Sequence, residues 1–221
     1  MEKLNTLIDH TLLKPEATKD QIITLCEEAK TYEFASVMVN SSWVKLCAEQ
    51  LKGTSVLVAS VVGFPLGAMS TEAKVFETKQ ALSDGAQEID MVINIGRLKD
   101  NDEEYVVNEI KSIKALLPDK ILKVIIETAL LSDDEKILAC KLVSEAKADF
   151  IKTSTGFSLH GATVEDVKLL REHVAPEVAV KAAGGVRSFE DVTKMVDAGA
   201  TRIGTSSGVK LMQGDKVEGS Y

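Results

Sequence analysis

Two lysines, Lys152 and Lys181, each end a short apolar run and open directly into a Ser/Thr/Gly-rich loop. A free lysine titrates near 10.4, so keeping one uncharged near pH 7 costs about 4 to 5 kcal/mol. Burial together with a second ammonium nearby can lower the pKa of a lysine, and the neutral amine is the nucleophile that Schiff-base chemistry with a carbonyl needs. Either lysine can instead be a solvated strand tip, and their residue type leaves open which of the two would react.

Asp90, in the apolar run 88–92, is the carboxylate that can accept and return protons beside such an amine. The alternative is that Asp90 neutralises Lys152 or Lys181 in a structural ion pair. Lys123 stands near the start of its own run, so we expect it to point toward the opposite, stability end of the fold. Glu127, at the end of that run, can line the site, but its sequence context assigns it no role.

The elements that must position these residues alternate along the whole chain. Short apolar runs occur at 7–9, 36–39, 56–62, 88–92, 122–126, 149–152, 178–181 and 202–204. Between them lie amphipathic stretches, four of which begin with patterns typical of capping boxes, at Thr18, Ser132, Thr163 and Ser188. Eight strand–helix units without a linker predict an α/β fold, a single-domain (β/α)8 barrel over residues 1–221 with a short C-terminal tail at about 212–221.

A repeated frame supports this prediction. The segments 86–90, 148–152 and 200–204 each place an alanine first, an isoleucine three residues later and a special residue at the end, namely Asp90, Lys152 and Gly204. If the frame is structural, these residues lie at the carboxyl ends of strands, where barrel active sites are built. The pattern is also common wherever a helix leads into a strand.

Glycines and serines in the last two strand-to-helix loops predict a phosphate site. Gly184 and Gly185 follow the seventh run, while Gly204, Ser206 and Ser207 follow the eighth and precede a short helix that ends near residue 211. In barrels these two loops often bind phosphate, because glycine lets backbone N–H groups approach the anion. One Gly-Gly pair alone would be only a turn.

Composition and charge narrow the remaining classes. The 221 residues are 45% hydrophobic, and the formal net charge of −8 argues against a nucleic-acid or anionic-membrane partner. The three cysteines are scattered without metal-ligand or disulfide spacing, and no apolar stretch is long enough for a membrane span. We therefore expect a cytoplasmic protein without a metal site.

Six stretches then carry a resemblance to the deoxyribose-phosphate aldolases, a class I aldolase family on a (β/α)8 barrel. They are IDHTLLK (8–14), GFPLG (63–67), EIDMVIN (88–94), FIKTSTG (150–156), VKAAGGVR (180–187) and GTSSG (204–208). The resemblance implies reversible cleavage of 2-deoxy-D-ribose 5-phosphate into glyceraldehyde 3-phosphate and acetaldehyde, in the catabolism of deoxyribose phosphates. It implies no cofactor and no metal; the partners are then the small-molecule sugar phosphate and aldehydes.

The resemblance also assigns roles. Lys152 corresponds to the Schiff-base nucleophile, Lys181 to the lysine that lowers its pKa and joins proton transfer, and Asp90 to the proton-relay carboxylate. Asp9 matches an acidic residue that supports Lys181. Tyr221, the last residue, matches a tyrosine that can fold over the site and donate a proton, although it can equally be a frayed terminus.

For the substrate, the resemblance adds Thr155 and Gly156 to the five loop residues named above. Two other readings stay open: a phosphosugar isomerase or transaldolase-like barrel enzyme, and a non-catalytic sugar-phosphate sensor. Members of the family occur as monomers or homodimers, and the sequence does not decide between these states.

Overall fold

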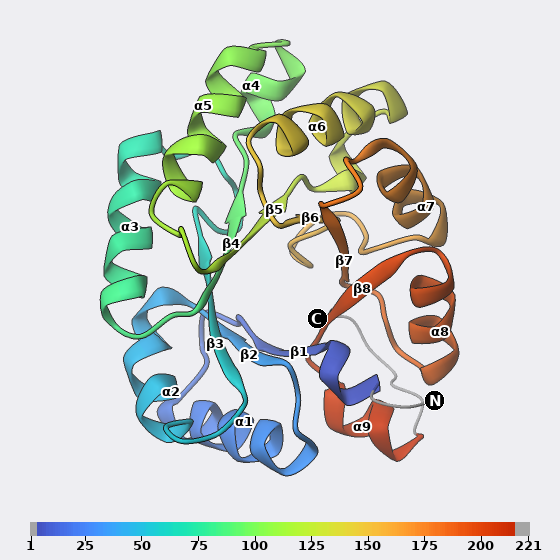
Figure 1. The fold of residues 1–221 in the computed structure, drawn as a ribbon. Coiled ribbons are helices and arrows are strands. Elements are labelled where there is room, and N and C mark those ends of the chain that lie inside the picture. The colour runs from blue at the N-terminus through green and yellow to red at the C-terminus, as the bar shows by residue number, and fades with distance from the viewer. Residues whose placement is uncertain (1–3, 215–221) are drawn as a thin grey trace.

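Short apolar runs and capped amphipathic segments form strands and helices in strict alternation. In the computed structural model, which describes residues 4–214, parallel strands close into one barrel in the order β1 to β8, and helices surround it (Figure 1). The strands are β1 (Ile8–Leu12), β2 (Ser36–Val39), β3 (Leu57–Val62), β4 (Glu88–Val92), β5 (Ile121–Ile125), β6 (Phe150–Lys152), β7 (Ala179–Ala183) and β8 (Ala200–Thr205). This confirms the predicted single-domain (β/α)8 barrel.

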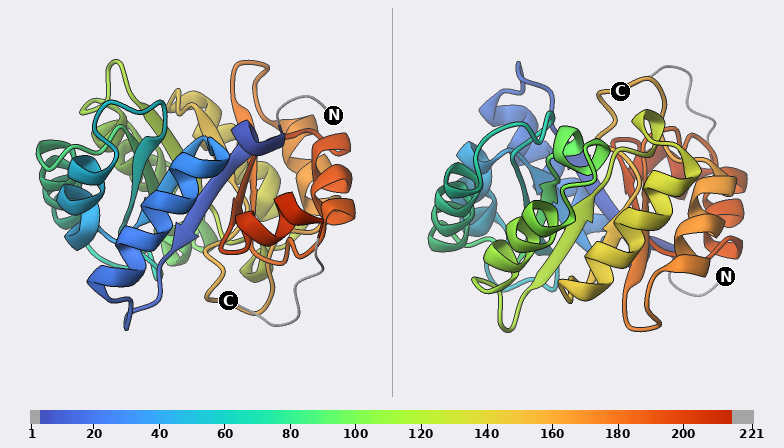
Figure 2. Two further views of the ribbon diagram at one scale, coloured as in Figure 1. Left: turned by 90° about the horizontal axis from the view of Figure 1, so that it is seen from below. Right: turned by 90° about the horizontal axis from the view of Figure 1, so that it is seen from above.

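The helices lie along the outside of the barrel, as the views in Figure 2 show. They are α1 (Lys19–Tyr32), α2 (Val44–Gln50), α3 (Thr71–Ser83), α4 (Ile95–Lys99), α5 (Glu103–Lys114), α6 (Asp133–Glu145), α7 (Val164–His173), α8 (Phe189–Asp197) and α9 (Gly208–Gln213). Three 3-10 helices add η1 (Leu4–Leu7), η2 (Ser41–Trp43) and η3 (Thr128–Leu130).

Two of the four expected capping boxes are complete. Thr18 and Ser132 exchange both bonds with the third helical residue, at the starts of α1 and α6. At the starts of α7 and α8 the cap hydroxyl accepts its backbone bond, but the aspartate expected to reciprocate binds elsewhere. Asp166 pairs with Lys136, and Asp191 accepts from the backbone N–H of Arg187.

The first strand is longer than its apolar run indicates, because β1 continues through His10 and Thr11 to Leu12. Both polar side chains are nearly buried, and the His10 ring packs against Phe34 with centroids 5.0 Å apart. The last strand similarly begins at Ala200, before the predicted start. In both cases polar residues interrupt the apolar pattern, so the sequence pattern predicts a strand that is too short.

The core has two parts. A large apolar layer lies between the strands and the surrounding helices, and a smaller cluster gathers Leu13, Met38, Ala59 and Val61, with Phe64 packed against it. The three cysteines are buried as free thiols in α1, α2 and α6. None of the helices between residues 4 and 214 combines the length and apolar character that crossing a bilayer requires.

Candidate active site

Lys152 and Lys181 face each other across neighbouring strands. Lys152 is the last residue of β6 and pairs in register with Lys181 of β7, where a bulge separates Val180 from Lys181. The Nζ atoms of both lysines lie 2.8 Å from the same atom, Oδ2 of Asp90 on β4. The structure thus brings together the two lysines and the carboxylate that the sequence singled out, all three inside the barrel.

Lys123 does not point to the stability end, as its position near the start of an apolar run suggested. It lies in the middle of β5, level with Asp90, and its Nζ is 2.9 Å from Asp90 Oδ1 and 2.5 Å from Glu88 Oε2. The expectation was wrong because β5 begins at Ile121, so that Lys123 is an inward-facing central residue. Lys123 therefore neutralises Asp90 from the side away from Lys152.

Asp9 and Arg202 extend the charges to β1 and β8. Asp9 Oδ2 lies 2.5 Å from Lys181 Nζ, and Asp9 Oδ1 accepts from Ser36 Oγ at 2.7 Å and from both Nε and Nη2 of Arg202. Arg202 also donates to Glu88 at 3.1 and 2.8 Å. We call this connected set the interior ion network: Asp9, Glu88, Asp90, Lys123, Lys152, Lys181 and Arg202.

Sequence reasoning missed Glu88 and Arg202. A signal was available, because both are charged residues in otherwise apolar strands, and Glu88 precedes Asp90 by two residues and so faces the same side. What the sequence did not show is the partner of each charge, since the network joins residues of β1, β4, β5, β6, β7 and β8.

The pKa values of Asp90 and Lys152 are both lowered, for different reasons. Burial lowers the pKa of Lys152 to about 8; Asp90 works against this change and Lys181 adds to it. Burial alone would raise the pKa of Asp90, but Lys123, Lys152 and Lys181 hold it well below its usual range. An amine that becomes mostly neutral only above about pH 8, 3% exposed, thus lies beside a persistently ionised carboxylate.

Three of the glycines predicted to hold phosphate lie where the loops after β6 and β7 meet. Gly156, Gly184 and Gly185 all have positive φ, at 86°, 75° and 77°. A Cβ on Gly184 would stand 3.1 Å from the Cα of Gly161 and 3.5 Å from that of Gly156, so bulkier residues would push the loops after β6 and β7 apart. Gly161, which the sequence did not single out, is part of this contact.

The remaining residues predicted to bind phosphate lie in and just after β8; they are Gly204, Ser206 and Ser207. A Cβ on Gly204 would lie 3.2 Å from Cε of Lys181, so this glycine leaves room for the lysine side chain. Ser206 is exposed and Ser207 is half-buried, with its backbone N–H donating to Thr205 Oγ1 at 3.1 Å. Both serines lie in the loop that precedes α9, and both keep part of their surface exposed.

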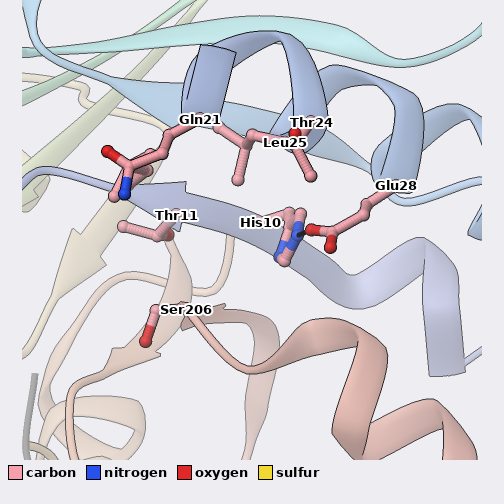
Figure 3. Close-up of a pocket in the computed structure, with 8 residues that line it drawn as sticks. His10, Thr11, Gln21, Thr24, Leu25, Glu28 and Ser206 are labelled. Atoms are coloured by element: carbon pink, nitrogen blue, oxygen red, sulfur yellow. Dashed lines mark hydrogen bonds and ion pairs between the residues drawn. The ribbon is translucent and has the colours of Figure 1, made fainter. Parts of the chain in front are cut away.

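A cleft of about 210 Å³ lies between β1 and α1 and is bordered by Ser206 (Figure 3). Six of its eight lining residues are polar; the lining comprises His10, Thr11, Leu12, Gln21, Thr24, Leu25, Glu28 and Ser206. His10 Nε2 lies 2.6 Å from Glu28 Oε2, and the two side chains point toward each other in Figure 3. This pair braces β1 against α1 beside the loop that carries Ser206.

Thr155 and Glu127 form a separate polar contact at the mouth. Both are buried, and the carboxylate of Glu127 accepts from the backbone N–H and the hydroxyl of Thr155. Thr155 Oγ1 also accepts from the backbone N–H of Phe157 at 3.0 Å. These bonds leave the hydroxyl of Thr155 at most one lone pair to offer a substrate.

Two further predictions concern a metal and the tail. Within residues 4–214, no group of three or more potential ligand side chains is placed to hold a metal ion. Tyr221 lies outside the described residues, as does most of the predicted tail, whose start at about 212 falls within α9.

Comparison with known proteins gives a consistent picture. The family model described as DeoC/LacD family aldolase matches residues 4–214. The deoxyribose-phosphate aldolase of Streptococcus uberis is 58% identical over 99% of this chain and 100% of its own length. That of Clostridium botulinum, strain Langeland, is 58% identical over 96% of this chain and 100% of its own length.

Solved structures agree. The tetrameric deoxyribose phosphate aldolase of Aeropyrum pernix superposes with a TM-score of 0.88 at 34% identity, covering 95% of this chain and 89% of its own. The family-model match over residues 4–214 includes the strands that carry the interior ion network and the glycine loops. The chain therefore belongs to the DeoC/LacD family of aldolases, lyases that break and form carbon–carbon bonds.

Proposed function

We propose that this aldolase works through a Schiff base on Lys152 and reversibly cleaves 2-deoxy-D-ribose 5-phosphate into D-glyceraldehyde 3-phosphate and acetaldehyde. The names of its relatives support the substrate, and the contact of Lys152 and Lys181 with one oxygen of Asp90 supports the chemistry. Such an enzyme would serve the catabolism of deoxyribose phosphates.

The charge count of the interior ion network favours Lys152 as the nucleophile. The network holds three carboxylates, Asp9, Glu88 and Asp90, against four cations, so one positive charge is in excess. Lys123, Lys181 and Arg202 each contact two or more carboxylates, whereas Lys152 contacts Asp90 alone among the described residues. Losing the proton of Lys152 balances the network at the lowest cost, because its ammonium has the least compensation.

In the first step, neutral Lys152 attacks C1 of the open-chain sugar phosphate. The carbinolamine takes up a proton on its oxygen and loses water, leaving a protonated imine. Lys181 is the nearby proton store, and Asp90, hydrogen-bonded to both amines, passes protons between them. The depressed pKa of Asp90 means that this carboxylate holds a proton only in passing.

Cleavage then follows from the positive imine. The hydroxyl on C3 gives up its proton to a base, the C2–C3 bond breaks, and its electron pair moves into the C1–C2 bond to form an enamine. Glyceraldehyde 3-phosphate leaves with the new C3 carbonyl. Protonation of the enamine at C2 and hydrolysis release acetaldehyde and restore the amine of Lys152.

The phosphate end would be held away from the reacting carbons. Gly156, Gly184 and Gly185 follow Lys152 and Lys181 within a few residues, and their backbone N–H groups would bind the anion. On the neighbouring strand β8, Gly204 is in register with Ala183, and Ser206 and Ser207 follow it. Binding energy from the phosphate then fixes C1 near the amine, which raises the rate of the chemical step. Asp9 supports Lys181 through their 2.5 Å ion pair.

Three predictions stay proposals here: a proton donated by Tyr221, a monomeric or homodimeric state, and a cytoplasmic location. The three buried free thiols support the last of these, because reduced cysteines suit a reducing compartment.

Reductive trapping tests the proposed function. Borohydride added with acetaldehyde should attach a two-carbon adduct to Lys152, seen by mass spectrometry of the peptide. Lys152→Ala should abolish both the adduct and cleavage, while Lys141→Ala, at an exposed lysine of α6, should leave both intact. Cleavage that persists when residue 152 is unlabelled would overturn the proposal.

A further inference from the structure

Glu127 has a backbone conformation that its residue type disfavours. It directly precedes η3, just past the end of β5, with φ 56° and ψ 68°, in the left-handed region that non-glycine residues seldom occupy. The residue is 2% exposed, although a carboxylate is costly to bury. Residues held in such conformations need support from their surroundings and gather at functional sites.

The support comes from the loop that follows Lys152. The two oxygens of Glu127 lie 3.3 and 3.2 Å from the backbone nitrogen of Thr155, and one of them also binds the Thr155 hydroxyl. Thr155 is three residues after Lys152. Next to this contact, the backbone N–H of Thr128 donates to the carbonyl of Thr153 at 2.9 Å.

The far end of the same loop is hydrogen-bonded to the end of β7 and to Gly184, one of the glycines proposed to bind phosphate. The backbone N–H of Ala162 lies 3.1 Å from the carbonyl oxygen of Ala183 and 3.0 Å from that of Gly184. Gly161 packs so closely on Gly184 that a Cβ would overlap its backbone. The segment between Lys152 and the phosphate site is thus tied down at both ends, by Glu127 at one and by β7 at the other.

The carboxylate of Glu127 also adds a charge to the surroundings of Lys152. Lys152 already faces Asp90 of β4, Lys123 of β5 and Lys181 of β7, and Glu127 interacts electrostatically with Lys152 and His160. Burial raises the pKa of Glu127, while the two Thr155 donors and the two cations act in the opposite direction.

We infer that Glu127 is a positioning residue for the aldol reaction: through Thr155 it holds the loop between Lys152 and the phosphate glycines, and its charge acts on the Lys152 amine. This rests on the proposed function of Lys152. It also gives the Thr155 hydroxyl a partner in the protein, in place of a substrate hydroxyl.

Glu127→Gln tests both parts, because the amide keeps the shape and one acceptor oxygen but removes the charge. A carboxylate favours the ammonium form of Lys152, so its removal lowers the pKa of that lysine. The acid limb of kcat/KM should move to lower pH by about half a unit, and kcat should fall about tenfold as the loop loses one bond.

Two matched variants separate charge from position. Thr155→Val removes the hydroxyl and keeps the charge of Glu127, so kcat should fall without movement of the acid limb. Thr155→Ser keeps the hydroxyl and should stay within about twofold of the wild-type kcat. If Glu127→Gln does not fold, the Val and Ser variants still decide, since equal and unchanged kinetics in both would overturn the inference.

The inference also falls if Glu127→Gln loses thermal stability while kcat, KM and the pH limb stay as in the wild type. Borohydride labelling of each variant keeps this failure distinct from failure of the proposed function. An adduct on Lys152 with unchanged kinetics refutes only the role of Glu127, whereas cleavage by the wild type without an adduct on Lys152 refutes the proposed function.

Discussion

Lys152 differs from the other cations of the interior ion network in both exposure and compensation. It touches one carboxylate oxygen in the described part of the chain, and it keeps a small exposed area at the barrel mouth. Lys181, which forms ion pairs with both Asp9 and Asp90, is fully buried. Residue type alone left the choice between the two lysines open, and the family resemblance implied Lys152; these contacts supply a physical reason for that preference.

The pKa of Lys152 predicts the pH dependence of imine formation. Because the amine must be neutral to attack, the rate should rise about tenfold per pH unit below 8 and level off above it. The positive charge of Lys181 favours the neutral form, so Lys181→Met should raise the pKa of Lys152 and move this limb to higher pH by about one unit.

The loss of Lys181 should also reduce kcat by about 10² to 10⁴-fold, because a proton store is removed. The pH profile of cyanoborohydride trapping with acetaldehyde measures the shift, with Lys141→Met as the control. If the acid limb of the pH profile stays at the same pH, or moves to lower pH, Lys181 does not lower the pKa of the Lys152 amine.

At the scale of elements, the barrel followed from the sequence while the contacts of one loop did not. Alternation of apolar runs and capped helices is a local pattern, so it predicted β1 to β8 within a few residues. The loop of residues 153–163 is positioned by Gly184 and Glu127, which are distant in the sequence. Nothing in the neighbourhood of Gly161 indicates that another backbone lies against its Cα.

Gly161→Ala tests whether this backbone contact positions the phosphate end. The added Cβ would overlap the Gly184 carbonyl group, so the loops after β6 and β7 must separate. Overpacking of this kind costs about 1–3 kcal/mol. We expect KM for the sugar phosphate to rise by more than kcat falls.

Gly96→Ala is the matched control, because its Cβ would find its nearest neighbour, Asn94 Oδ1, at 3.5 Å. Unfolding in urea should place that control within about 0.5 kcal/mol of the wild type. A KM for Gly161→Ala equal to that of the wild type would mean that the contact does not position the phosphate.

For the whole molecule, the interior ion network replaces part of the apolar filling that a barrel usually has. Its charges come from six strands, so each finds its partners only when the barrel closes. This explains why the sequence predicted the closed fold but not the network: apolar runs are recognised strand by strand, whereas the pairing of Arg202 with Asp9 spans 193 residues. Removing one member of such a set leaves a buried charge without its partner, which destabilises the fold.

Arg202→Met tests that dependence. The variant leaves Asp9 and Glu88 with fewer cations in a buried site, and breaking such a set costs about 3–5 kcal/mol near pH 7. Arg97→Met, which removes an exposed 3.0 Å pair with Asp102, should cost less than about 1 kcal/mol.

The cost of Arg202→Met should depend on pH through Asp9. Burial alone would raise the pKa of Asp9, but Lys181, Arg202 and Lys123 outweigh it and hold the pKa well below its usual range. The ionised carboxylate therefore stabilises the wild type above the unfolded-state pKa, and this contribution is lost only as pH falls through the folded pKa. Without Arg202 the folded pKa rises, so Asp9 binds a proton at a higher pH and part of the penalty disappears. Urea unfolding at pH 7, 5.5 and 4 should show the gap between variant and wild type narrowing toward pH 4; a constant gap would mean that Arg202 contributes packing and not charge.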